Sequence, residues 1–434
     1  MKRAFAAIGL VACSSTSPAG DPFPVHVDLT SGAVMVHIAR PGDATPLVAT
    51  LDVLAPFTLI DPGPGEKAVE RVATDVALFG QATAGSSALI ERARFDVDVV
   101  SLHPCDLAQA KCTVGPASAP IAIDAVLGAD AIGGSAIRFD LPRGDLYVFP
   151  DIAGETRLRD SECDGVFPSP FRGGGTLVLG GADVSFSGRR VAIGACLGDD
   201  VTDTAKGTGV DALFVWSTGI GPTVISESAY QLSCVDQCAR PCIAACTDAS
   251  DQTCVTACRE PCATTCKATA AASPAAQVLL PSGAISGHQG TLATLSLVAA
   301  PEALGTVGSR GPCRDLHAAR RLPLPELSTD DQAALCTDQS TCSAPATIEL
   351  TPTTPIPVVV VPDADPTLQA LRAELRPDQP EVDGILGVDA MRALTVDLDY
   401  PNNRLLARCR GQAGCLVRPQ LTSLVHAASV MGCN

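Results

Sequence analysis

The sequence lacks the excess of basic residues that nucleic-acid binding requires. Its 30 lysines and arginines are outnumbered by 47 aspartates and glutamates, giving a formal net charge of −17. Proteins that neutralise phosphates do so with clustered Lys and Arg side chains, and the chain has no such stripe. We therefore expect no nucleic-acid partner, and interpret the acidic surface as one that keeps the protein soluble.

Long hydrophobic runs are also missing, since no segment is apolar over the roughly 20 residues that a membrane-spanning helix needs. The N-terminus, MKRAFAAIGLVAC, has two cations and a short apolar run, which is typical of an export signal. Residues 10–13 resemble the lipobox of bacterial lipoproteins, which predicts lipid attachment at Cys13. We expect an exported protein of the cell envelope, held to a membrane by this lipid. The alternative is an ordinary cleaved signal with an incidental cysteine.

Several patterns of catalytic and metal sites are absent. The six histidines are scattered and form no His-x-x-x-His pair. No Gly-x-Ser-x-Gly elbow occurs. The glycines of 173–181 precede a predicted strand rather than opening a helix, so they indicate a turn and not a phosphate loop. We expect neither a cofactor nor a metal ion.

Aromatic residues make up only 3% of the chain, whereas prolines number 34 and glycines 38. With many Val, Ile, Leu and Thr residues, this composition favours a β-rich protein with many turns over a helical bundle. A chain of 434 residues is long for one domain, which predicts two units or one bilobal body.

An internal repeat divides the chain into two halves. Residues 123–148 align without a gap to residues 382–407, and each copy predicts a buried strand, a short helix and two strands joined by a turn. Identical residues stand at Asp124/Asp383, Leu127/Leu386, Gly128/Gly387, Asp130/Asp389, Ala131/Ala390, Asp140/Asp399, Pro142/Pro401 and Leu146/Leu405. We interpret the recurring Asp124, Asp130, Asp383 and Asp389 as helix caps and turn formers.

These features predict the domain organisation. Residues 1–20 form the signal and tether, 21–155 the first lobe and 176–434 the second lobe. Between the lobes, 156–175 is a Pro/Gly-rich linker. A cysteine-rich insertion, 232–268, lies within the second lobe.

The insertion is predicted to be an antiparallel helical hairpin. Its cysteines recur at intervals of four, which places them on one face of a helix, and a polar stretch at 247–253 joins the two arms. Opposite faces of such a pair meet in nested order. The predicted disulfides are Cys234–Cys266, Cys238–Cys262, Cys242–Cys258 and Cys246–Cys254.

Cysteine counting favours disulfides, because the 19 cysteines less Cys13 leave an even number. A zinc cluster is the alternative for the eight in the hairpin. Pro241 and Pro261 lie inside the arms and should kink them. Short spacings predict three further local pairs, Cys105–Cys112, Cys336–Cys342 and Cys409–Cys415.

Each half also has an apolar strand that runs into a small-residue turn, APFTLIDPG at 55–63 and DALFVWSTG at 211–219. Together with the downstream repeats, AVLGADAI and DGILGVDAM, they resemble the pepsin and retropepsin aspartic proteases. The resemblance covers 40–150, 185–230 and 345–410. It implies a mainly β, two-lobed aspartic-protease-like fold, a duplicated retropepsin-like β-barrel with an inserted disulfide-linked α-helical hairpin.

In that family, each half brings one aspartate of Asp-Thr-Gly to a shared cleft. Two close carboxylates share one proton, so that one activates a water and the other polarises the scissile carbonyl. By this resemblance Asp61 is the aspartate of the first half, and Ser217 stands in the aspartate position of the second. Pro62 replaces the Thr or Ser that braces the partner loop. The remaining residues expected to line the cleft are Gly63, Trp216, Thr218 and Gly219.

Three functions are compatible with such a site. The first is a catalytically inactive descendant whose cleft is unused or binds an extended peptide or protein segment. The second is a structural or surface-display lipoprotein that contacts an envelope protein through the hairpin. The third is residual aspartic-type hydrolysis, either by Asp61 with a Ser217-bound water or by Asp61 of two paired chains.

Overall fold

The protein is described by a computed structural model. The described residues are 24–61, 70–81, 86–101, 112–116, 121–149, 165–168, 171–179, 182–198, 210–246, 252–280, 283–298, 346–351, 355–375, 381–401, 404–409 and 414–419. The predicted signal with Cys13, Cys105 of the predicted pair Cys105–Cys112, and the predicted pair Cys336–Cys342 lie outside this part of the chain.

The first half is built around a buried strand, β9 (Ala125–Leu127). β3 (Leu47–Leu51) runs parallel to β9, and β4 (Leu59–Ile60) runs antiparallel to it on the other side. β4 in turn lies parallel to β6 (Leu89–Ser101). The chain between β3 and β4 therefore passes over the end of β9.

The second half repeats this arrangement around β22 (Val382–Leu386), whose five residues are all buried. β15 (Val210–Trp216) is parallel to β22 and β16 (Thr223–Ser226) is antiparallel to it. β16 also runs parallel to β21 (Ile356–Val361). The two related lobes predicted from the internal repeat are therefore confirmed.

The repeats join the lobes through a shared sheet. β10 (Ala136–Asp140) of the first copy pairs antiparallel with β23 (Leu394–Asp399) of the second. β11 (Asp145–Phe149) and β24 (Arg404–Cys409) flank them. In this register Arg138 lies opposite Asp397, and these are equivalent positions of the two copies, 259 residues apart.

The Arg138 guanidinium donates two hydrogen bonds to the Asp397 carboxylate, Nε to Oδ1 at 2.7 Å and Nη2 to Oδ2 at 2.8 Å. A position that faces its own equivalent across a twofold axis would meet an identical side chain in a symmetric pair. Here the two copies hold opposite charges, so the interface is complementary rather than repulsive.

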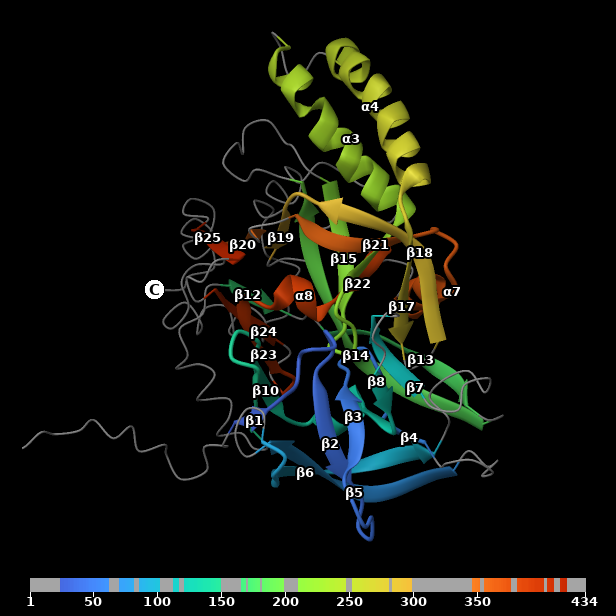
Figure 1. Cartoon of the computed structure of the whole chain (residues 1–434), viewed down its shortest axis with the longest axis vertical. Helices are drawn as coiled ribbons and strands as arrows, with labels where there is room; N and C mark the ends of the chain where they lie inside the picture. The colour runs from blue at the N-terminus through green and yellow to red at the C-terminus, as the bar shows by residue number, and fades with distance from the viewer. Residues whose placement is uncertain are drawn as a thin grey trace, which may run out of the picture.

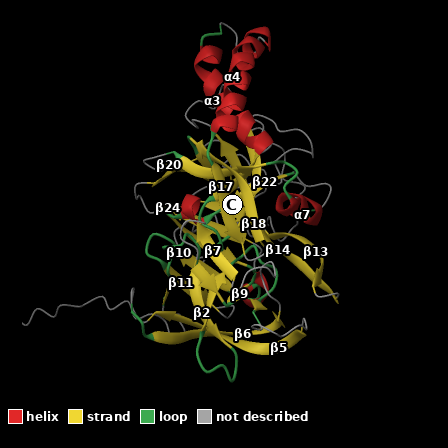
Figure 2. Ribbon diagram, turned by 45° about the vertical axis from the view of Figure 1, so that its right-hand side comes forward, coloured by secondary structure: helices red, strands yellow, loops and turns green. Residues whose placement is uncertain are grey.

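The remaining strands complete two large sheets (Figures 1 and 2). The first sheet also contains β1 (Val25–His26), β2 (Met35–Ala39), β5 (Glu70–Gln81) and β12 (Gly165–Pro168). The second contains β7 (Cys112–Pro116), β8 (Ile121–Ile123), β14 (Ala182–Leu197), β17 (Ala275–Leu280), β18 (Gly283–Leu292), β19 (Leu295–Val298), β20 (Ala346–Thr351) and β25 (Gly414–Pro419), and β13 (Phe171–Leu179) pairs with β14.

Part of the predicted linker is strand rather than loop. β12 pairs with β24 of the shared sheet, and β13 forms a hairpin with β14. Prolines and glycines in this stretch indicated an irregular connection, but edge pairing accepts both residue types. The described chain thus enters the second lobe through paired strands.

The inserted hairpin projects from one end of the body as α3 (Glu227–Ala244) and α4 (Gln252–Ala272) (Figure 1). All four of its predicted disulfides are present, as is Cys409–Cys415. Each helix continues through its internal proline, Pro241 or Pro261. Disulfides on both sides of each proline hold the two helices together.

Among the described residues, no helix is both long and apolar enough to cross a membrane. The helices of the hairpin carry mostly small and polar residues on their exposed surfaces. The largest fully buried side chains belong instead to the sheets, and the three largest by volume are Trp216, Phe139 and Phe214.

Candidate site at the junction of the two lobes

Ser217 faces a carboxylate of the other lobe. Its hydroxyl donates a hydrogen bond of 2.8 Å to Oδ1 of Asp52. Asp52 directly follows β3 and Ser217 directly follows β15, so both residues stand at the same place in their lobes. The Asp52 N–H donates to the carbonyl of Leu127 and the Ser217 N–H to the carbonyl of Leu386, each at 3.0 Å. Leu127 and Leu386 are themselves matched positions of the repeat.

Other paired contacts fix the same equivalence. The Thr58 hydroxyl accepts from the Gly128 N–H, and the Thr223 hydroxyl accepts from the Gly387 N–H, at 3.2 and 3.3 Å. Thr58 lies six residues after Asp52, and Thr223 lies six residues after Ser217. The lobes are therefore aligned at an offset of 165 residues here, the separation of Asp52 from Ser217.

The aspartates of the repeat have a different role from the one expected. Oδ2 of Asp124 accepts from the Val48 N–H, and Oδ2 of Asp383 accepts from the Leu213 N–H. The short helices that follow, α1 (Ala129–Ile132) and α8 (Val388–Met391), begin at glycines with no side-chain cap. Asp124 and Asp383 thus join neighbouring strands, and their interpretation as helix caps is wrong.

The predicted pairing of Asp61 with Ser217 is wrong. The Asp61 N–H donates to the carbonyl of Asp124, three residues before Leu127 along the chain that forms β9. Because a strand rises about 3.3 Å per residue, Asp61 lies roughly 10 Å along the strand from Asp52. Asp61 and Ser217 each stand two residues before a glycine, Gly63 or Gly219, and this shared spacing pointed to the wrong aspartate. Pro62 and Gly63 lie outside the described residues.

A signal for Asp52 was present in the sequence. Both turns have a threonine six residues on, followed by two β-branched or aliphatic residues, as Thr58 and Thr223 show. Asp52 was missed because Val53 and Leu54 follow it, whereas Thr218 and Gly219 follow Ser217.

Thr218 supplies the brace between the two loops. Its hydroxyl donates to the carbonyl of Leu51 at 2.7 Å and accepts from the N–H of Val53 at 3.1 Å. Val53 is the matched residue of the first lobe and has no hydroxyl to return the contact. The hydroxyl contact from the second lobe to the first is therefore present, and Val53 makes no reciprocal hydroxyl contact. The position matched to Thr218 is Val53 and not Pro62, the residue expected from the sequence.

The Asp52 carboxylate is enclosed. Only 3% of the residue is exposed, and Ser217 is fully buried. Oδ1 of Asp52 also accepts from the N–H groups of Leu54 and Gly219, at 3.0 and 3.2 Å. A side chain at Gly219 would place its Cβ 2.7 Å from the Asp52 carboxyl carbon, so only glycine fits there.

Burial raises the pKa of Asp52 above its ordinary value, because the charged form loses its hydration. Hydrogen bonds from Leu54, Ser217 and Gly219 and the charge of Arg190 act in the opposite direction but do not cancel the effect. Arg190 is itself held by two hydrogen bonds to Glu374, at 2.8 and 2.9 Å.

Trp216 does not line an exposed surface. It is completely buried and packs edge-on against Phe139, with ring centroids 5.3 Å apart. The expectation that Trp216 lines the cleft is therefore wrong, because its side chain lies in the core. Thr218 is buried as well.

The site holds one carboxylate and one alcohol. A serine hydroxyl does not ionise in the range where carboxylates titrate, so this pair cannot share a proton in the way two aspartates do. The alcohol donates its hydrogen to the carboxylate instead. Chemically, the arrangement can hold the two loops together, but it lacks the second acid of an aspartic protease.

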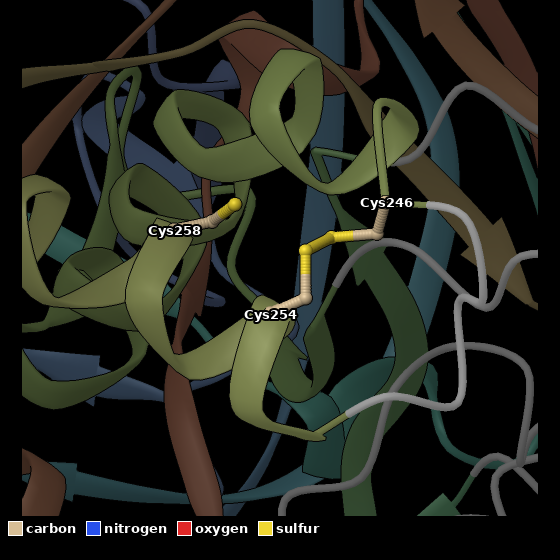
Figure 3. A group of neighbouring side chains, drawn as sticks. All are labelled: Cys246, Cys254 and Cys258. Carbon is tan, nitrogen blue, oxygen red and sulfur yellow. A yellow bond between two sulfur atoms is a disulfide. The ribbon is translucent and has the colours of Figure 1, made fainter.

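A second group of neighbouring reactive side chains, three cysteines, lies in the hairpin. The sulfurs of Cys246, Cys254 and Cys258 lie within 4.8 Å of one another (Figure 3). Cys246 is bonded to Cys254, and Cys258 to Cys242. In this oxidised state the hairpin is pinned by disulfides, and the zinc cluster considered as the alternative is not what holds it.

We predict that Asp52→Asn flattens the dependence of stability on pH. The pKa of Asp52 in the folded protein is raised above 3.8, its value in the unfolded chain. The neutral carboxyl therefore contributes its full share to the free energy of unfolding below pH 3.8, and this contribution is lost as the pH rises through the folded pKa. Asparagine keeps the acceptor oxygen and does not titrate. Urea unfolding between pH 3 and pH 7 measures the difference, with Asp61→Asn as the control. An identical fall in stability for Asp52→Asn and the unaltered protein would contradict this.

No known protein family matches the chain by sequence, and no curated protein matches it. Among solved structures, the chain is similar to an aspartic proteinase from Irpex lacteus, with 11% identity and a TM-score of 0.35 over 92% of this chain and 99% of that one. It is also similar to Basic 7S globulin from soybean, with 10% identity and a TM-score of 0.36 over 90% of this chain and 94% of that one. The site described above stands on this chain's own hydrogen bonds.

Proposed function

We propose that this is a non-catalytic protein of the aspartic-protease-like fold, which acts by binding rather than by hydrolysis. One observation carries the proposal: the position of the second lobe that matches Asp52 is Ser217, and Asp52 accepts a hydrogen bond from the alcohol of this serine. Hydrolysis by this kind of site needs a charged carboxylate and a neutral one at once. With serine in place of one aspartate, the site has no second carboxyl group to remain neutral while the first is charged.

The structure retains the support of the site although the chemistry is lost. The Thr218 brace, the paired contacts of Thr58 and Thr223, and the close approach of Gly219 all remain. We infer that these contacts keep the lobes in the relation needed to bind an extended peptide or protein segment between them. The protein is proposed to do this at the cell envelope, anchored through Cys13.

The absence of hydrolysis is tested directly. We expect no cleavage of denatured protein substrates by the full chain between pH 2 and pH 8, with pepsin as the positive control at acid pH. Asp52→Asn and Asp61→Asn serve as a matched pair of variants. Cleavage that Asp52→Asn abolishes and Asp61→Asn leaves intact would overturn the proposal and identify Asp52 as a working acid.

The binding site is tested with a library of extended peptides that carry a photoactivatable group. We expect cross-links to the two loops at the half-buried Ala55, Pro56 and Pro222, which flank the Asp52–Ser217 pair. Cross-links confined to residues 227–272 would instead favour a surface protein that acts through its hairpin. If cross-linking does not exceed that of an unrelated control protein, the result contradicts peptide binding.

Lipid anchoring rests on the sequence of the N-terminus and is tested separately. Cells that express the chain are labelled with a radioactive fatty acid and fractionated. We expect label on the protein in the membrane fraction, and both label and membrane association lost in Cys13→Ser. Retention of the membrane association by Cys13→Ser would exclude the lipid as the anchor.

A further inference from the structure

The outer half of the hairpin brings together four cysteine sulfurs, those of Cys242 in α3, of Cys246 just after α3, and of Cys254 and Cys258 in α4. Three of them, on Cys246, Cys254 and Cys258, lie within 4.8 Å of one another (Figure 3). The fourth, on Cys242, is bonded to Cys258. Among the described residues, the other four cysteines of the hairpin form no such group. The two outer disulfides are therefore closer to each other than the regular spacing of the ladder requires.

The four backbone positions have the dimensions of a tetrahedral thiolate site. Across the hairpin the Cα atoms are 5.6 Å apart for Cys242 and Cys258 and 6.2 Å apart for Cys246 and Cys254. Along α4, Cys254 and Cys258 are four residues apart, which at a rise of 1.5 Å per residue separates them by about 6 Å, and Cys246 lies two residues beyond the end of α3. A tetrahedral ion with Zn–S bonds of about 2.3 Å needs sulfurs about 3.8 Å apart. Rotation of the side chains alone covers the difference.

Each outer disulfide has a sulfur-bearing residue that a reductant can reach. Cys242 is exposed and its partner Cys258 is buried, whereas Cys246 and Cys254 are both half-buried. In the inner half, Cys238 is exposed and Cys234 half-buried, and their partners Cys262 and Cys266 are buried. The helices also pack through Ala239, Cys258 and Cys262, against partly buried side chains that include Val235 and Ile243. These contacts favour the same pairing of the helices after the outer bonds are opened.

We propose that reduction converts the outer half of the hairpin into a binding site for a thiophilic divalent cation such as Zn²⁺, with four ligands: Cys242, Cys246, Cys254 and Cys258. A dithiol reductant supplies two electrons and two protons to each of the two disulfides and is itself oxidised to a disulfide. The four thiols then release four protons as they bind the ion. The metal replaces two covalent links between the helices with one coordinated centre.

The test uses the full chain, reduced with a dithiol and freed of reductant under anaerobic conditions. Zn²⁺ bound per chain is measured, and Cd²⁺ serves as a second probe through its thiolate charge-transfer absorption. We expect one ion per reduced chain at this site and none per oxidised chain. Failure of the reduced chain to bind Zn²⁺, or equal binding by the oxidised chain, would overturn the proposal.

Matched variants locate the ion, since cysteines outside the hairpin also become free on reduction. Cys242→Ser/Cys258→Ser removes two ligands and one disulfide, whereas Cys234→Ser/Cys266→Ser removes one disulfide and no ligand. We expect at least tenfold weaker Zn²⁺ binding in the first and little change in the second, with helix content checked by circular dichroism. Equal affinity in both variants, or a loss only in the second, would place the ion elsewhere and contradict the assignment.

Discussion

The hydroxyl of Thr218 is the contact on which the junction of the two lobes depends. It crosses from the second lobe to the first, where it donates to the carbonyl of Leu51 and accepts from the N–H of Val53. The Thr218 carbonyl accepts from the N–H of Val34 of the first lobe as well. All these groups are buried, so water cannot replace a lost partner and each broken contact would leave a polar group unsatisfied. These contacts of Thr218 hold Asp52 and Ser217, its neighbours in the two loops, beside each other.

Matched positions of the two lobes have diverged into complementary residues. Asp52 and Ser217 are an acceptor and a donor at equivalent sites. Arg138 and Asp397 form a two-bond ion pair at equivalent sites of the shared sheet, where the side chains are largely buried. Two aspartates at either place, or two arginines in the shared sheet, would bring like charges together. A single chain with two different halves can place unlike residues at matched positions, whereas a symmetric dimer of one half places identical residues there.

The helical hairpin is stabilised by a different means from the rest of the body. Few of its side chains are buried and most of its exposed residues are small, so hydrophobic burial contributes little. Four disulfides close successively shorter loops between the helices, which restricts the unfolded chain. Its base is attached to the body, where Arg240 donates to the carbonyl of Gly198 and Tyr230 accepts from the N–H of Thr291. The first helix of the hairpin starts directly after β16, at Glu227, ten residues after Ser217.

Much of this organisation could be predicted from the sequence, because it follows from local spacing. The duplication was visible in the matched repeats, and the order of the disulfides in the hairpin followed from cysteines four residues apart on two antiparallel helices. The serine in place of an aspartate at position 217 was also visible, because Thr218 and Gly219 kept the rest of the motif. Only the tertiary structure decided which carboxylate meets it. The register along β9 places Asp52 beside Leu127 and Asp61 beside Asp124, three residues earlier in the chain. This register depends on pairing between strands that are distant in the sequence, and the residues next to either aspartate do not encode it.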